Sequence, residues 1–345
     1  MTVYDIPFSI LDLAPVVEGS TPADSFRNTL DLAQHAEKWG YHRFWLAEHH
    51  NMPGISSSAT SVVIGYVAAG TEKIRVGSGG IMLPNHAPLV IAEQFGTLES
   101  MYPGRIDLGL GRAPGSDQVA ARALRRGLGS NGEDFPEQLN ELRYYFNPDA
   151  DLEPTGFLPR AVPGEGLNVP IWLLGSSGFS AQLAAHHGLP FAFASHFAPD
   201  FLMQALEIYR SGFKPSDALE KPHAMIGVNV IVADTDKAAH WLATSQEQAF
   251  LNLIRGRMTK LKPPVDSMDE LWNEQERMIV QKQLSFTIAG SKATVREKLA
   301  SILEQTKADE LIVASQLYDH AARLRSYELL AEIVNESRAE AASGK

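Results

Sequence analysis

The sequence contains no cysteine in 345 residues. This absence excludes disulfide bonds, thiolate metal ligands, cysteine-ligated iron–sulfur clusters and a cysteine nucleophile. Long apolar runs are also absent, because none reaches the roughly 18 residues that a membrane-spanning helix needs. The first basic residue is Arg27, so the start lacks the positively charged region of a signal peptide. We therefore expect a soluble cytoplasmic protein with no membrane partner.

Positive charge is the scarcer sign, with 30 Lys and Arg residues against 41 Asp and Glu residues. The formal net charge of −11 would repel a phosphate backbone, so nucleic acid is not an expected partner. Hydrophobic residues make up 44% of the chain and charged residues 21%, enough apolar material for a large buried core. This composition argues against intrinsic disorder.

Short apolar, β-branched runs alternate with amphipathic segments of helical length, a pattern typical of repeated strand–helix units and a parallel sheet. We count eight such units, with expected strands at residues 7–13, 43–47, 74–83, 106–111, 169–174, 191–195, 225–232 and 311–314. This count predicts an α/β fold, a (β/α)8 TIM barrel. We expect one domain over residues 1–335 and a frayed tail over 336–345.

Two stretches are too long to be ordinary connections. Residues 113–168, after the fourth strand, are rich in Gly, Pro and Arg, and 133–146 could form a helix within them. Residues 255–283, after the seventh strand, combine Lys and Pro with an acidic amphipathic part, which is typical of a mobile lid. We read both as insertions into the barrel.

An open dinucleotide-binding sheet is the alternative fold, but its Gly-rich turn does not follow the first strand. The nearest phrase, Gly109-Leu110-Gly111 with Gly115, has the wrong spacing, and no phosphate-binding Gly-x-x-x-x-Gly-Lys-Ser/Thr loop occurs. The barrel is therefore favoured. In a barrel the active site lies at the carboxyl ends of the strands.

The second strand ends in Glu48-His49-His50, which places two imidazoles at that rim. Side chains alternate faces along a strand, so ligands of one metal would be two residues apart, whereas His49 and His50 should point to opposite sides. We predict no metal and one histidine facing the mouth as a proton donor or acceptor. The alternative is that local loop contacts satisfy both rings. His196 and Phe197, after the sixth strand, are mouth candidates by position only.

The third strand contains Gly77, Gly79 and Gly80 where a buried parallel strand normally has Val or Ile. Glycine lacks the Cβ atom that would block a flat ligand or a strained backbone. We therefore expect either the close approach of a flat group or a simple bend at the rim.

The segment from Gly175 to Ser180 passes from a strand to a helix through consecutive Gly and Ser residues. Free amides at a helix N-terminus and serine hydroxyls favour a phosphate, and Arg112 from the fourth strand reaches the same rim. The alternative is a serine N-cap and an unrelated surface arginine. Asp107 alternates with apolar residues, so we interpret it as a structural ion-pair partner.

Four segments together resemble the bacterial luciferase-like flavin monooxygenase family, and more closely its alkanal monooxygenase-like branch: residues 45–50, 76–84, 104–112 and 174–177. The resemblance runs from about residue 7 to 327. It implies a TIM barrel that takes reduced FMN as a cosubstrate from a separate NAD(P)H flavin reductase. The reduced flavin would add O2 to form a peroxyflavin and oxygenate a small organic substrate.

The resemblance also implies roles for single residues. His49 matches the family's active-site histidine, and Gly79 and Gly80 match a non-proline cis peptide against the flavin ring. The residues that match the FMN phosphate site are Arg112, Gly175, Ser176 and, by proximity, Ser177. The 255–283 segment corresponds to luciferase's mobile loop, and a homodimer through the helices of the first three units is the expected assembly.

One departure limits the resemblance: Gly111 stands where luciferase has a cysteine near the flavin, which argues against light emission and a long-chain aldehyde substrate. A deazaflavin-dependent oxidoreductase of the same superfamily is one alternative. A flavin-binding protein without turnover is a second alternative, and a metal-dependent hydrolase is a third and remote one.

Overall fold

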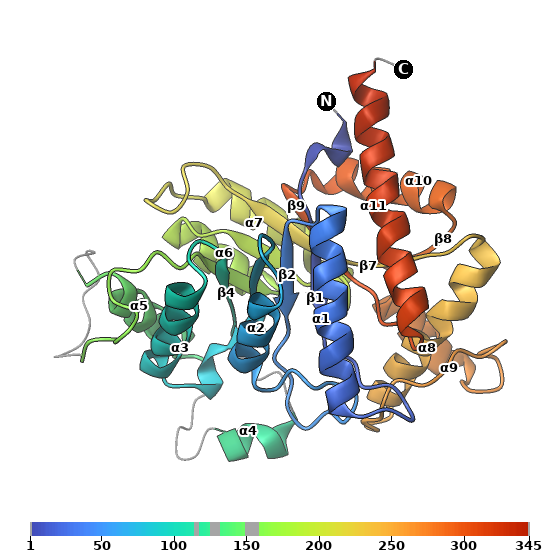
Figure 1. The fold of residues 1–345 in the computed structure, drawn as a ribbon, viewed down its shortest axis with the longest axis horizontal. Helices are drawn as coiled ribbons and strands as arrows, with labels where there is room; N and C mark the ends of the chain where they lie inside the picture. The colour runs from blue at the N-terminus through green and yellow to red at the C-terminus, as the bar shows by residue number, and fades with distance from the viewer. Residues whose placement is uncertain (1, 114–116, 125–131, 149–158, 344–345) are drawn as a thin grey trace.

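A computed structural model describes residues 2–113, 117–124, 132–148 and 159–343. These residues form parallel strands surrounded by helices (Figure 1). The strands are β1 (Phe8–Asp12), β2 (Arg43–Leu46), β3 (Arg75–Met82), β4 (Ile106–Gly111), β5 (Ile171–Gly175), β6 (Phe191–Phe193), β7 (Ala224–Val232), β8 (Thr287–Gly290) and β9 (Glu310–Ala314).

The sheet closes on itself. Strands β1 to β6 pair in sequence order, β6 pairs with β7, and β9 lies between β7 and β1. Eight parallel strands therefore form a complete ring, which confirms the predicted (β/α)8 TIM barrel. The expected eighth strand is β9, whereas β8 pairs, among the described strands, only with the carboxyl half of β7, outside the ring.

The helices lie around this ring, and α1 and α11 run side by side on one side of it (Figure 1). They are α1 (Pro22–Trp39), α2 (Thr60–Ala69), α3 (Pro88–Met101), α4 (Gln118–Leu124), α5 (Phe135–Phe146), α6 (Gly178–His187), α7 (Leu202–Gly212), α8 (Asp236–Ile254), α9 (Glu274–Gln283), α10 (Lys292–Thr306) and α11 (His320–Ala342). Helices α4 and α5 lie in the first predicted insertion, parts of which are outside the described residues. No helix in the described ranges is long and apolar enough to cross a membrane.

Local sequence explains where the helices begin and end. In α1, Thr21 and Asp24 form reciprocal capping bonds, and Pro22 occupies the first turn, where its missing N–H is not needed. Gly40 ends the helix with φ of 83°, a left-handed conformation that favours glycine.

The expectation of a frayed tail over 336–345 is wrong as far as Ala342, because α11 continues to that residue. Glu336 pairs with Lys292 and Arg296 on α10, and Arg338 donates to the carbonyl oxygens of Tyr4 and Ile6 at 2.8 Å each. These contacts tie the end of the last helix to the start of the chain.

The barrel interior has an apolar layer above a charged one. Leu11, Trp45, Trp172, Met225 and Ile312 pack together in the middle of the barrel. These side chains fill the ring, so the barrel has a packed core and no open channel.

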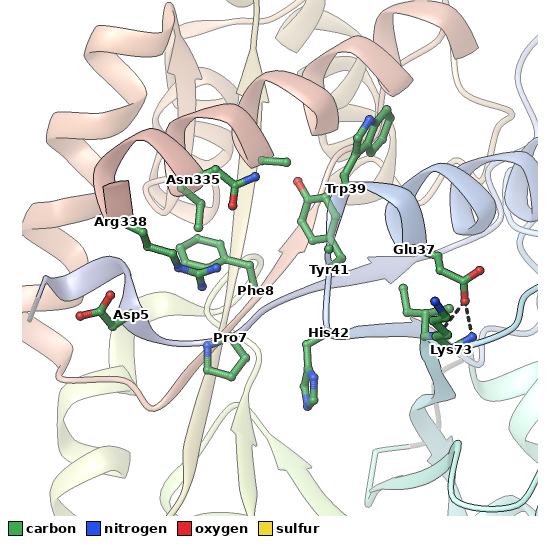
Figure 2. Close-up of a pocket in the computed structure, with 14 residues that line it drawn as sticks. Asp5, Pro7, Phe8, Glu37, Trp39, Tyr41, His42, Lys73, Asn335 and Arg338 are labelled. Carbon is green, nitrogen blue, oxygen red and sulfur yellow. Dashed lines mark hydrogen bonds between the residues drawn. The ribbon is translucent and has the colours of Figure 1, made fainter. Parts of the chain in front are cut away.

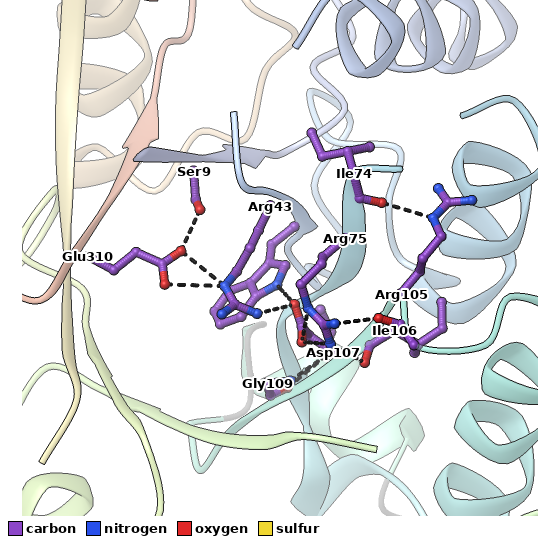
Figure 3. A network of polar contacts seen from close by, with 12 residues as sticks. Ser9, Arg43, Ile74, Arg75, Arg105, Ile106, Asp107, Gly109 and Glu310 are labelled. Atoms are coloured by element: carbon purple, nitrogen blue, oxygen red, sulfur yellow. Dashed lines mark hydrogen bonds and ion pairs between the residues drawn. The ribbon is translucent and has the colours of Figure 1, made fainter. Parts of the chain in front are cut away.

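Below this layer, toward the amino ends of the strands, charged side chains form a network (Figure 3). Arg43 lies between two fully buried carboxylates and donates to Asp107 at 2.7 Å and to Glu310 at 3.0 Å. Asp107 also accepts from Arg75 at 2.6 Å and from the Trp45 indole at 3.1 Å. This geometry agrees with the structural interpretation of Asp107.

Candidate active site

A cavity of about 470 Å³ opens at the carboxyl ends of the barrel strands. The seven residues that the resemblance assigns to the site all line it: His49, Gly79, Gly80, Arg112, Gly175, Ser176 and Ser177. They come from four successive strand ends, β2 to β5, so the closed ring brings segments far apart in sequence to one site.

A second cavity of about 450 Å³ lies at the opposite end of the barrel (Figure 2). Asp5, Trp39, His42 and Arg338 line part of it. None of its described lining side chains has a buried polar atom without a partner, whereas three side chains of the first cavity do. The first cavity therefore carries the unmet hydrogen-bonding capacity expected of a ligand site.

Glu48 organises the histidine segment. Its carboxylate is fully buried and accepts from His50 Nε2 at 2.7 Å, His86 Nε2 at 3.0 Å, the Met82 N–H at 2.9 Å and Asn85 Nδ2 at 3.1 Å. His50 is thus held on the Glu48 carboxylate. The neighbouring ring of His49 lines the cavity, so the two histidines face different ways, as the strand alternation predicts.

The Glu48 cluster predicts a defined pH dependence of stability. Burial opposes the charged carboxylate, but hydrogen bonds from His50, His86 and the Met82 N–H outweigh it and lower the pKa of Glu48 from 4.5 to about 2. Because the pKa of Glu48 is lower in the folded state than in the unfolded state, its charge stabilises the fold at pH values above the unfolded-state pKa. This stabilisation is lost as the pH falls toward the folded-state pKa. We estimate this contribution at ~3 kcal/mol at neutral pH.

Urea unfolding of wild type and the Glu48→Gln variant at pH 7, 5, 4 and 3 measures the contribution of the Glu48 charge to stability. The variant should be less stable at pH 7, and the difference in unfolding free energy should shrink between about pH 5 and pH 3. A difference that stays constant across this range would show that the Glu48 charge does not stabilise the fold.

The glycines of β3 allow atoms of the neighbouring strands to pack closely against its backbone. A Cβ atom on Gly79 would lie 2.7 Å from Leu11 Cδ1, and one on Gly80 would lie 2.7 Å from the Gly109 carbonyl oxygen. The Gly79–Gly80 peptide is cis, as the resemblance implies, and the β3–β4 register shifts between Ser78 and Ile81. The predicted bend is therefore present, and both glycines also line the cavity.

The predicted phosphate cradle lies at the start of α6. Ser177 occupies the N-cap position, but its side chain makes no capping hydrogen bond, so the simple N-cap alternative does not describe it. The Arg112 guanidinium lies 4.1 Å from the centre of the Phe179 ring in the first turn of α6. This cation–π contact holds the arginine beside the helix N-terminus, where amides, hydroxyls and a positive charge converge.

The 255–283 segment lies against the cavity. Met258, Thr259 and Leu261 line it, and Leu261 donates to the Val16 carbonyl oxygen at 3.0 Å. Its own carbonyl accepts from the Glu18 N–H at 2.8 Å. Two backbone bonds therefore fasten this loop to the segment between β1 and α1, and the loop borders the cavity as a lid would.

Several cavity residues were missed from the sequence. Gln246 on α8 and Gln283 on α9 were not singled out, and Asn229 on β7 donates to the His196 carbonyl oxygen at 2.5 Å. His196 itself, placed at the mouth only by position, lines the cavity. Burial first, and then the neighbouring His49, lower the pKa of His196 to about 4, so its ring is neutral at pH 7. No local sequence pattern indicates that a glutamine on a helix will line a cavity.

Comparisons with known proteins identify the family to which the chain belongs. The chain matches the family described as luciferase-like monooxygenase over residues 6–310. It is 60% identical over 329 residues to the uncharacterized protein YvbT of Bacillus subtilis, covering 95% of this chain and 97% of that protein. It is 56% identical over 339 residues to a luciferase-like monooxygenase of Escherichia coli, covering 97% and 99%. The solved structure of apo-MsnO8 matches with a TM-score of 0.83 and 36% identity, covering 96% and 98%. The chain therefore belongs to the luciferase-like monooxygenase family.

Proposed function

We propose that this protein is the oxygenase component of a two-component system that uses reduced FMN and O2 to oxygenate a small organic substrate. The observation that carries the proposal is one cavity that combines an anion cradle, a glycine surface and a histidine: Arg112 with Ser176 and Ser177, Gly79 with Gly80, and His49. A phosphate, a flat ring system and a proton donor or acceptor are the groups that such a set suits.

The residues present fit FMN. Arg112, the two serine hydroxyls and the first amides of α6 would hold the phosphate, with Phe179 keeping the guanidinium in place. Gly79 and Gly80 both line the cavity, so the ring would lie against backbone atoms there. When bound, reduced flavin would supply the electrons that activate O2.

Two other parts of the cavity would serve the reaction. His49 would hold or move a proton near the flavin, while its neighbour His50 is fixed by Glu48. The lid residues Met258 and Leu261 would exclude water from the reactive groups.

Relatives support an oxygenase. A Bacillus subtilis protein named N-acetyl-S-alkylcysteine monooxygenase is 35% identical over 338 residues, covering 95% of this chain and 98% of its own. A solved structure titled as the oxygenating constituent of a diketocamphane monooxygenase in complex with FMN has the same fold, with a TM-score of 0.72 at 20% identity.

A deazaflavin-dependent oxidoreductase is the second candidate. A solved structure titled as an F420-dependent secondary alcohol dehydrogenase shares the fold, with a TM-score of 0.64 at 16% identity. The same cavity would receive either cofactor, so cofactor preference separates the two candidates.

The proposed partners are a separate NAD(P)H flavin reductase and a second copy of this chain. The homodimer would form through α2 and α3, where Val62 is 71% exposed and Met101 is 59% exposed. Exposed large apolar side chains on two neighbouring helices would suit such an interface.

An anaerobic thermal-shift titration tests the proposed cofactor. Reduced FMN should raise the midpoint temperature more than oxidised FMN, because a ligand that binds only the native state stabilises it by mass action, ~2.7 kcal/mol at a hundredfold excess over Kd. A larger effect of oxidised FMN would indicate a resident flavin. No shift with either form, together with a shift by reduced deazaflavin, would contradict the proposal and favour the second candidate.

A further inference from the structure

Helix α8 presents a mixed stripe to the cavity. Its cavity-lining residues are Gln246, Ala249, Phe250 and Leu253, at the i, i+3, i+4 and i+7 spacing of one helix face. Gln246 is 1% exposed and Leu253 is 42% exposed, so the amide lies deep and the apolar part leads outward to the surface.

The amide of Gln246 is left without hydrogen bonds. Both its Oε1 and its Nε2 atom are buried, and neither has a partner among the described residues. Gln248, two residues further on, is buried as well, but its Nε2 donates to the Pro263 carbonyl oxygen at 2.8 Å. Because a buried amide without partners destabilises a fold, an unpaired one that lines a cavity points to a ligand that completes its hydrogen bonds.

Two more polar atoms of this cavity have no partner in the described part of the chain: Gln283 Oε1 on α9 and His196 Nδ1 after β6. Neither side chain carries a charge at neutral pH, since the pKa of His196 is lowered to about 4 by burial and by His49. The unmet groups are therefore neutral donors and acceptors, and they match a neutral polar group better than an ion.

We propose that the substrate is an elongated apolar molecule with a neutral amide head, which pairs with Gln246 while its tail lies along Ala249, Phe250 and Leu253. The substrate N–H would donate to Gln246 Oε1, and the substrate carbonyl would accept from Nε2. A carboxylate has no N–H for Oε1 and would leave that atom unpaired. This inference rests on the proposed function, because it names the substrate class of that site.

Matched probes test the inference on the flavin-free protein. Octanamide and methyl heptyl ketone have the same heptyl chain and carbonyl group, and the ketone has a methyl group where octanamide has its amino group. Octanoate is the charged analogue with the same chain. In calorimetric titrations, wild type should bind octanamide at least about tenfold more tightly than the ketone or octanoate. Neither of these two ligands has an N–H group, so each would leave the buried Gln246 Oε1 atom unpaired.

The Gln246→Met variant keeps the side-chain volume and removes both hydrogen-bonding atoms. It should lose the preference for octanamide and keep the affinity for the ketone. Without ligand it should melt about 2 °C higher than wild type, since a buried unpaired amide has been removed. Gln305→Met, at an exposed position on α10, should change neither quantity.

Three results would overturn the inference: no amide preference in wild type, a preference that survives in Gln246→Met, or a fall in FMN affinity of the variant as large as its fall in octanamide affinity. The last result would assign Gln246 to the flavin, whose ring also carries an N–H beside a carbonyl. Failure of wild type to bind any FMN would contradict the proposed function alone, because the octanamide titration needs no flavin.

Discussion

The Arg112→Ala variant is expected to bind FMN at least about tenfold more weakly than wild type and to bind riboflavin with unchanged affinity. A charge-assisted hydrogen bond to a phosphate contributes roughly 1.5–3 kcal/mol, which is tenfold or more in affinity. Riboflavin has the same ring and no phosphate, so it cannot gain from a guanidinium held beside the start of α6 by Phe179.

Anaerobic calorimetric titrations of both flavins in their reduced form with wild type, Arg112→Ala and Arg122→Ala measure this effect. Arg122 is an exposed cation on α4 and corrects for a general change in net charge. An equal loss of FMN and riboflavin affinity in Arg112→Ala would mean that the arginine shapes the cavity without binding phosphate.

The Asp107→Ala variant is expected to lose about 3–5 kcal/mol of unfolding free energy, the largest effect of any single change considered. Its carboxylate is fully buried and accepts from Arg43, Arg75 and the Trp45 indole. Removing it leaves two guanidinium groups facing each other inside the barrel with one fewer counter-charge. Glu310 remains on the far side of Arg43 and compensates only part of the loss (Figure 3).

Equilibrium urea unfolding at neutral pH measures this loss, with Glu304→Ala on the exposed face of α10 as the matched acidic control. The control should unfold within about 0.5 kcal/mol of wild type. A loss below about 1 kcal/mol in Asp107→Ala would contradict this expectation and show that the network adds little to stability.

The barrel could be predicted because each strand is a short apolar run between helical segments, and the structure keeps this order from β1 to β7. The sequence did not reveal β8, because its four residues have no distinguishing pattern and pair only with the end of β7. The end of α11 was missed for a similar reason: its stability there depends on contacts of Arg338 and Glu336 with segments far away in the chain.

The site shows the same division. Glycine runs, serines before a helix and an arginine after a strand are local signals, so Gly79, Arg112 and Ser177 could be named in advance. Gln246 could not be named in advance, because it is a candidate only through the burial of its amide without hydrogen-bond partners among the described residues. Such burial is defined by the packed structure. Glu48 was seen beside the histidines, but its four donors come from two separate segments and could not be assembled from spacing.

A crystal structure of the protein grown anaerobically with reduced FMN tests the central claim most directly. The account predicts FMN in the cavity at the carboxyl ends of the strands. Its phosphate should lie within hydrogen-bonding distance of Arg112, Ser176 and Ser177, and its ring should lie against Gly79 and Gly80. FMN bound in the cavity at the opposite end of the barrel, or a phosphate placed away from α6, would contradict it.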